Sequence, residues 1–118
     1  WYKQPFRGGA IKINNADVVI ANSLFENNLV AGLELENCTT TIENTTFKDH
    51  QAKYGYGMEG SKGLLVKNAV PVLTNVVFNN NYYGIYIDGG NCPGLSGVAF
   101  GTEDGANSID IYPKSCSP

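Results

Sequence analysis

Residues Gly8–Asn28, GGAIKINNADVVIANSLFENN, contain a pattern that the remainder of the chain repeats. The stretch opens with two glycines and the apolar residues Ile11 and Ile13, turns on two asparagines, and ends on Phe25 followed by further asparagines. A recurring unit of about two dozen residues is typical of a solenoid, because each unit buries its apolar face only against its neighbours. The stretch therefore predicts one unit of a stack.

Columns of like residues keep the repeat in register. An apolar pair opens each unit: Ile11/Ile13, Leu33/Leu35, Leu64/Val66, Ile85/Ile87 and Ile109/Ile111. A phenylalanine follows fourteen residues after the first member in three units and fifteen after in the fourth, at Phe25, Phe47, Phe78 and Phe100. A residue that tolerates a left-handed turn also recurs, at Asn15, Asn37, Asn68 and Gly89. The columns predict that like residues lie above one another.

Within each unit the apolar period is two, which is the period of a β-strand. Lys12, between Ile11 and Ile13, is expected to face outward. The residues in the same position of the later units are Glu34, Leu65, Tyr86 and Asp110. Each unit is too short for a helical crossover. The sequence therefore predicts an all-β parallel β-solenoid of about five coils, roughly 21–24 residues per coil with one longer coil.

A chain of 118 residues fits a single domain, here residues 1–118. Residues 1–7 are predicted to form an N-terminal cap or leader, residues 49–62 a loop inserted in the long second coil, and residues 113–118 a C-terminal tail. Because the chain begins at Trp1, without an initiator methionine or a signal-peptide pattern, we expect a processed product, a fragment or an incomplete start.

Composition narrows the classes of function. Hydrophobic residues make up 42% of the chain and charged residues 16%, which is typical of a globular protein. The net charge is −3, and the seven lysines are scattered, with Arg7 as the one arginine. Nucleic-acid binding needs clustered positive charge, so no nucleic-acid partner is expected. No apolar run approaches the about 20 residues of a membrane-spanning helix, so no spanning segment is expected either.

The repeats resemble those of the right-handed parallel β-helix family, the architecture of pectate lyases and related proteins. More narrowly, Gly8-Gly9-Ala10-Ile11 and the Phe25-Glu26-Asn27-Asn28 segment resemble the GGA(I/L/V) and FxxN signatures of polymorphic outer-membrane-protein repeats. Phe78-Asn79-Asn80-Asn81 repeats FxxN, whereas the second and fourth units place His50 and Glu103 at its last position. The resemblance implies the fold, and such repeats occur in enzymes, adhesins and extracellular structural proteins alike.

A polysaccharide lyase of this fold would place an arginine or lysine base near carboxylates that hold calcium, and a glycosidase would bring aspartates together. Arg7 precedes the first coil, and the outward positions do not stack two carboxylates. Lys12, Asp88 and Asp110 are the nearest candidates, but the motifs of those enzymes are missing. The sequence therefore predicts no catalytic residues, and the protein is expected not to be an enzyme.

His50, the one histidine, has two interpretations. It can replace the last asparagine of FxxN in a turn, which is the interpretation we favour, or act as a base oriented by Asp49. One histidine and three separated cysteines give no metal-ligand spacing, so neither a metal nor another cofactor is expected.

The cysteines predict one disulfide. Cys92 follows Ile85 by seven residues and Cys116 follows Ile109 by seven. Equal offsets in successive coils are vertical neighbours, and a spacing of about 4.8 Å suits a disulfide between Cys92 and Cys116. Cys38 is expected to be free and buried. A structural disulfide indicates an oxidising, extracellular compartment, where the sequons at Asn37 and Asn44 are candidate glycosylation sites.

Tyrosines outside the predicted core form the candidate binding surface. They cluster on one strand and on the inserted loop, at Tyr54, Tyr56, Tyr82, Tyr83 and Tyr86. Flat aromatic rings stack on sugars or on a partner protein, and the alternative is that these rings only cover strand edges.

The sequence favours an extracellular structural or adhesive module at the cell surface. Such a module could stack end to end into a surface filament or appendage, or contact other cell-surface proteins or glycans. The alternative is a carbohydrate-active enzyme, a polysaccharide lyase or glycoside hydrolase, or a glycan-binding module on the same fold.

Overall fold

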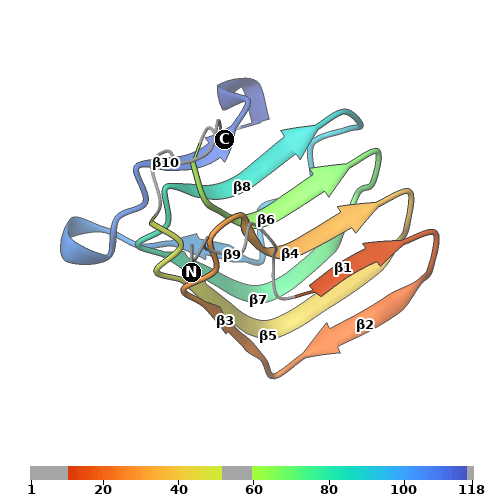
Figure 1. Cartoon of the computed structure of the whole chain (residues 1–118), viewed down its shortest axis with the longest axis horizontal. Helices are drawn as coiled ribbons and strands as arrows, with labels where there is room; N and C mark the ends of the chain where they lie inside the picture. The colour runs from red at the N-terminus through yellow and green to blue at the C-terminus, as the bar shows by residue number, and fades with distance from the viewer. Residues whose placement is uncertain (1–10, 52–59, 117–118) are drawn as a thin grey trace, which may run out of the picture.

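The computed structural model describes residues 11–51 and 60–116 as an all-β structure (Figure 1). Sheet A has the strand order β1 (Ile11–Asn14), β4 (Ala31–Glu36), β6 (Lys62–Lys67), β8 (Tyr83–Asp88) and β10 (Ile109–Tyr112). Sheet B has the order β2 (Val18–Ala21), β5 (Thr40–Lys48), β7 (Val72–Asn79) and β9 (Val98–Phe100), and β3 (Leu24–Glu26) also pairs with β5. Two short 3-10 helices are η1 (Glu103–Gly105) and η2 (Lys114–Cys116).

Every strand pair in these two sheets is parallel. The chain passes from sheet A to sheet B and back, and each pass adds a layer to the stack, as Figure 1 shows from the red end to the blue end. The predicted all-β class and parallel stacking are therefore confirmed. The predicted cap at residues 1–7 lies outside the described residues, and only 49–51 and 60–62 of the predicted loop lie within them.

The predicted columns hold through most of the stack. Leu33 pairs with Ile11 on one side and with Leu64 on the other, and Leu64 pairs with Ile85. The interior is filled by a column of phenylalanines, with ring centroids 4.9 Å apart from Phe25 to Phe47, 4.9 Å from Phe47 to Phe78 and 5.8 Å from Phe78 to Phe100. Like side chains thus fill the shared core, as the sequence predicts.

The register of the last strand is different from the predicted one. Ile111, and not Ile109, lies opposite Ile85, so that Tyr112 lies opposite Tyr86. A slip of two residues keeps every side chain on its own face of the sheet, so the alternation of apolar residues cannot detect it. The extra residues of the segment containing η1 allow the slip.

The predicted left-handed turns are confirmed. The φ angles are 57° at Asn15, 51° at Asn37, 49° at Asn68 and 87° at Gly89. Asparagine recurs in this conformation at other corners too, and side-chain hydrogen bonds link some of these corners up the stack. Asn75 Nδ2 donates to Asn44 Oδ1 at 2.8 Å, and Asn80 Nδ2 donates to Asp49 Oδ1 at 2.8 Å.

Gly63 is required by the close approach of neighbouring strands. A Cβ at this position would lie 2.9 Å from the Gly84 carbonyl oxygen and 3.1 Å from Phe47 Cβ. We expect Gly63→Ala to lower the free energy of unfolding by about 1–3 kcal/mol, because backbone and a packed ring must both move. Gly94→Ala is the matched control, since nothing lies within 4 Å of its added Cβ. Urea unfolding followed by circular dichroism measures both, and equal losses would contradict this packing.

Candidate functional site

Four tyrosines, three on sheet A and one immediately before β8, form a connected cluster of rings, which we call the tyrosine cluster: Tyr82, Tyr83, Tyr86 and Tyr112. Tyr83 packs edge-on against Tyr82 at 4.9 Å and against Tyr86 at 5.0 Å between centroids. Tyr86 and Tyr112 are stacked, 4.9 Å apart with 22° between their planes. Tyr83 is buried, whereas Tyr112 is 43% exposed. The cluster therefore has a buried base and an exposed rim.

Lys62 supports this cluster from β6. Its Nζ donates a hydrogen bond to the Gly60 carbonyl at 2.9 Å and lies 4.9 Å from the centroid of the Tyr86 ring and 5.6 Å from that of Tyr83. A cation over an aromatic face is attracted to the electron-rich ring. The buried lysine thus fixes the orientation of Tyr86 and of the ring stacked on it.

The structure brings Tyr82, Tyr83 and Tyr86 together as predicted and adds Tyr112, which the sequence analysis did not include in the surface. Only the two-residue register shift places Tyr112 beside Tyr86. In the sequence, only an alignment of Ile111 with Ile85 would have placed Tyr112 beside Tyr86. Tyr54 and Tyr56 lie outside the described residues.

A row of paired charges lies on the outer face of sheet A, where Leu65 of β6 separates Glu34 from Tyr86. The buried Oε2 of Glu34 lies 3.4 Å from Lys12 Nζ and 3.3 Å from Lys67 Nζ, and Lys12 Nζ is 3.6 Å from Glu36 Oε1. The pKa of Lys12 is raised, first by the charge of Glu34 and then by Glu36. Lys12 therefore stays protonated and is a poor base near neutral pH.

The candidate catalytic aspartates do not converge. Asp88 ends β8, whereas the register of β10 places Asp110 level with Gly84, four positions away along the strand. At about 3.3 Å per residue this is about 13 Å, more than the separation of a pair of glycosidase carboxylates. Asp110 Oδ1 also accepts a hydrogen bond from Asn107 Nδ2 at 3.0 Å. Arg7 lies outside the described residues.

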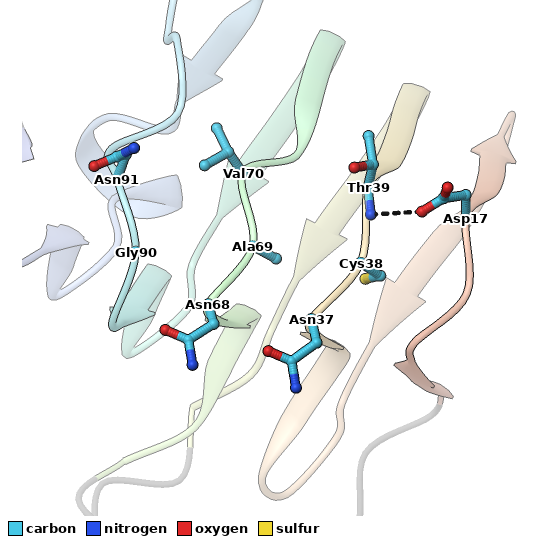
Figure 2. A pocket seen from close by; sticks show the side chains of 9 residues that line it. All are labelled: Asp17, Asn37, Cys38, Thr39, Asn68, Ala69, Val70, Gly90 and Asn91. Atoms are coloured by element: carbon cyan, nitrogen blue, oxygen red, sulfur yellow. Dashed lines mark hydrogen bonds between the residues drawn. The ribbon is translucent and has the colours of Figure 1, made fainter.

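An open groove of about 550 Å³ runs over successive turns between the two sheets (Figure 2). It is lined by Asp17, Asn37, Cys38, Thr39, Asn68, Ala69, Val70, Gly90 and Asn91. Asp17 is the one charged residue in this lining, and its Oδ1 accepts the Thr39 backbone N–H at 2.9 Å. The lining of the groove thus holds one carboxylate and no acid–base pair, and the remaining polar groups that it offers to a ligand are neutral.

His50 is part of a buried ladder that runs through the turns between β-sheet B and sheet A. Its Nδ1 accepts the backbone N–H of Asn28 at 3.0 Å, and its Nε2 lies 3.1 Å from the Phe25 carbonyl oxygen. Asn81 makes the corresponding contacts one layer on: Oδ1 accepts the His50 N–H at 3.2 Å and Nδ2 donates to the Phe47 carbonyl at 3.0 Å. His50 thus replaces asparagine in the ladder, as the favoured interpretation predicts.

The ladder continues to a residue that the sequence analysis misassigned. Asn107 Oδ1 accepts the Asn81 N–H at 2.9 Å, and Asn107 Nδ2 donates to the Phe78 carbonyl at 2.9 Å. Asn107, and not Glu103, therefore fills the last FxxN position of the fourth unit. Glu103 lies in η1, and the residues of that segment separate Phe100 from its ladder partner.

The alternative role of His50 as a base is disfavoured by its surroundings. The side chain is fully buried, and both ring nitrogens contact backbone groups. Burial is the main cause that lowers the pKa of His50 from its usual 6.5. The ring is thus neutral near pH 7 and is occupied by structural hydrogen bonds.

Cys92 and Cys116 are joined by a disulfide, with a Cα–Cα distance of 5.4 Å, which is the predicted pairing. Cys38 is free as predicted, but it is half-buried and not buried, because its column opens on the groove. Both sequon asparagines are exposed at left-handed turns, and Asn44 Oδ1 accepts a hydrogen bond from Asn75 Nδ2. Glycosylation at Asn37 and Asn44 stays a prediction.

The described residues hold no group of three or more histidine, cysteine or carboxylate side chains arranged for a metal ion. Within the same residues, no helix has the length and apolar character to cross a membrane.

The sequence was also compared with known proteins. Residues 5–100 match the protein family described as the right-handed β-helix region. No curated protein and no solved structure matches the chain. The match does not test the narrower resemblance to polymorphic outer-membrane-protein repeats, which stays a resemblance. Because the family match covers most of the chain and agrees with the parallel stacking of both sheets, the chain belongs to the right-handed β-helix family.

Proposed function

We propose that this protein is a non-catalytic extracellular β-helix module with a structural or adhesive role, and that the tyrosine cluster is its contact surface. The stacked pair Tyr86 and Tyr112 is the observation that carries the proposal. Rings that are held rigidly and exposed at one edge lose little conformational entropy when a partner packs on them. Sugars and protein side chains both pack on such rings.

The paired charges on the outer face of sheet A support a role without catalysis. A catalytic base or acid needs a side chain that is available to exchange a proton with substrate. Lys12, Lys67, Glu34 and Glu36 are instead paired with one another, and Asp110 is bonded to Asn107. These pairings fit a surface that recognises charge and shape more than they fit a reaction centre.

The disulfide between Cys92 and Cys116 supports the extracellular part of the proposal, since such bonds persist in oxidising compartments.

The proposed structural role includes self-association. In the described residues, β1 and β10 end sheet A, and end strands with free backbone groups invite pairing with another chain. End-to-end contact with a second copy or with another cell-surface protein would cover them.

The second candidate is a carbohydrate-active enzyme or a glycan-binding module on the same face. The stacked pair Tyr86 and Tyr112 favours the glycan-binding module, because sugar rings pack on exposed aromatic faces. A glycan-binding module shares this surface with the adhesive role, so catalysis is the property that separates the enzyme from both.

Truncating the exposed rings tests the contact surface. We expect Tyr86→Ala and Tyr112→Ala each to weaken binding to glycan-array or cell-surface ligands by about tenfold, through loss of stacking and packed area. Surface plasmon resonance on the strongest ligand measures the change. Val72→Ala, on the outer side of sheet B and 54% exposed, is the control and should bind like the wild type. Equal binding by all three variants would refute the assignment of this surface.

A further inference from the structure

The geometry of His50 determines its protonation state without any titration. The backbone N–H of Asn28 is always a donor, so Nδ1 at 3.0 Å must carry a lone pair. The Phe25 carbonyl oxygen is always an acceptor, so Nε2 at 3.1 Å must carry the hydrogen. Both bonds are made at once only by the neutral ring with its hydrogen on Nε2.

The ring joins two repeat units at one point. Phe25 lies in β3 and Asn28 in the turn after it, whereas His50 follows β5. The His50 N–H donates to Asn81 Oδ1, and the His50 carbonyl accepts the Tyr82 N–H at 2.7 Å. A Cβ on Gly32 would lie 2.9 Å from Nε2, so the ring packs in the space that the glycine leaves. A change at Nδ1 therefore acts on the turn after β3 and not on the layers beyond Asn81.

We propose that His50 is an acid-sensitive latch: when Nδ1 takes up a proton, the turn after β3 detaches from the second repeat unit while the later units stay stacked. The proton places two donors face to face, Nδ1–H and the Asn28 N–H, and breaks their hydrogen bond. It also leaves a charge in a buried site. The segment concerned lies at the end of the described stack, where β3 pairs with β5, so that local opening costs less there than in the interior.

Among the described residues, few charged groups lie near the ring. Asp49 precedes it in the chain, and Glu26 on β3 is paired with Lys48 Nζ at 3.9 Å. The β4 side contributes Gly32 and the next layer contributes Asn81, both of which are neutral. The two carboxylates favour the protonated ring, but burial outweighs them and the pKa is lowered from 6.5. The closed latch therefore binds its proton more weakly than the open one.

The latch is less stable at acid pH, because the ring binds a proton more tightly in the open segment than in the closed one. Above the pKa of the open segment, 6.5, the latch has its full stability. As the pH falls below that value, the open segment takes up the proton first, and stability is lost until the lower pKa of the closed ring is reached. One proton allows the opening equilibrium to increase by up to about tenfold per pH unit in this window. The latch is independent of what the tyrosine cluster binds.

Hydrogen exchange followed by mass spectrometry tests the latch. Protection factors are compared between about pH 7.5 and about pH 5 for peptides covering residues 24–30 and residues 76–82. We expect protection of the first peptide to fall by up to about tenfold per pH unit below about 6.5, with the second unchanged. A constant value for residues 24–30, or an equal loss in both peptides, would overturn the proposal.

The matched variant is His50→Asn, which supplies the carboxamide that Asn81 and Asn107 use in the same column and does not titrate. Its protection of residues 24–30 should not change with pH, and the same loss as in the wild type would overturn the proposal. Nitrogen chemical shifts of the single histidine provide a second measurement on the wild type. We expect an unprotonated Nδ1 and a protonated Nε2 at neutral pH, and a hydrogen on Nδ1 would contradict the latch.

Discussion

Phe47→Ala is expected to lower the free energy of unfolding by about 3–5 kcal/mol. Phe47 is fully buried, and its ring lies 4.9 Å from Phe25 on one side and 4.9 Å from Phe78 on the other. Truncation removes two stacked contacts and leaves a cavity between Phe25 and Phe78. The neighbouring layers cannot close this cavity, because backbone hydrogen bonds set the spacing of the strands. A chain of this size should then melt more than about 10 °C lower.

Phe100→Ala is the control at the end of the same column. Its ring is partly exposed and stacks on Phe78 at 5.8 Å. With one stacked neighbour and less buried area, we expect about half the loss of stability seen for Phe47→Ala. Urea unfolding under oxidising conditions compares the two variants. If they lose the same stability, the phenylalanine column does not act as a stack.

Asn81→Leu is expected to lower the free energy of unfolding by about 2–6 kcal/mol although leucine fills a similar volume. Asn81 is fully buried, and its side chain bonds the His50 N–H and the Phe47 carbonyl. Leucine leaves these two groups without partners away from water, at about 1–3 kcal/mol each. The loss of stability thus measures how much the buried hydrogen bonds of Asn81 contribute to the free energy of unfolding.

Asn28→Leu is the matched control, because Asn28 is the first residue of the same ladder in the described part of the chain. Its carboxamide donates to the Glu26 carbonyl at 3.3 Å in an exposed position. Water can replace that bond, so we expect a loss below about 1 kcal/mol. Thermal unfolding of the two variants side by side measures the difference. A similar loss at both positions would mean that the buried hydrogen bonds of Asn81 contribute little.

The sequence was sufficient to predict the repeat, the strands and the corners, and each for a physical reason. Period-two alternation at Ile11 and Ile13 requires a strand, stacked Phe25 and Phe47 require a parallel neighbour, and asparagine at Asn37 fits a left-handed turn. These features depend on residues close in sequence or at a fixed offset. Both kinds of information are present in a single chain.

The register of the last unit was harder to predict, because the segment around η1 does not follow the repeat pattern. The residues of η1 shift the ladder asparagine to Asn107 and bring Ile111, not Ile109, opposite Ile85. A register shift of two leaves the apolar pattern intact, so only the hydrogen bonds of the ladder distinguish the two alignments. The position of Tyr112, and with it the exposed part of the tyrosine cluster, depends on this choice.

The chemistry of the surface could be predicted least. The fold occurs with and without catalysis, so function depends on the outward side chains and their contacts. The sequence reveals only part of their pairing: Lys12 and Glu34 share a predicted outward column, whereas Lys67 contacts the same carboxylate from the position opposite Glu36. The spacing of charges along one strand does not reveal such a contact.

Product analysis tests the central claim, that this β-helix binds without catalysis, most directly. The wild-type protein is incubated with polyuronates and with plant and algal polysaccharides, and new reducing ends and unsaturated products are measured by mass spectrometry. We predict binding to the tyrosine cluster, weakened about tenfold in Tyr112→Ala, without new products. Turnover by the wild type that disappears in Asp88→Asn, Asp110→Asn or Lys12→Met would contradict the claim and identify the protein as a carbohydrate-active enzyme.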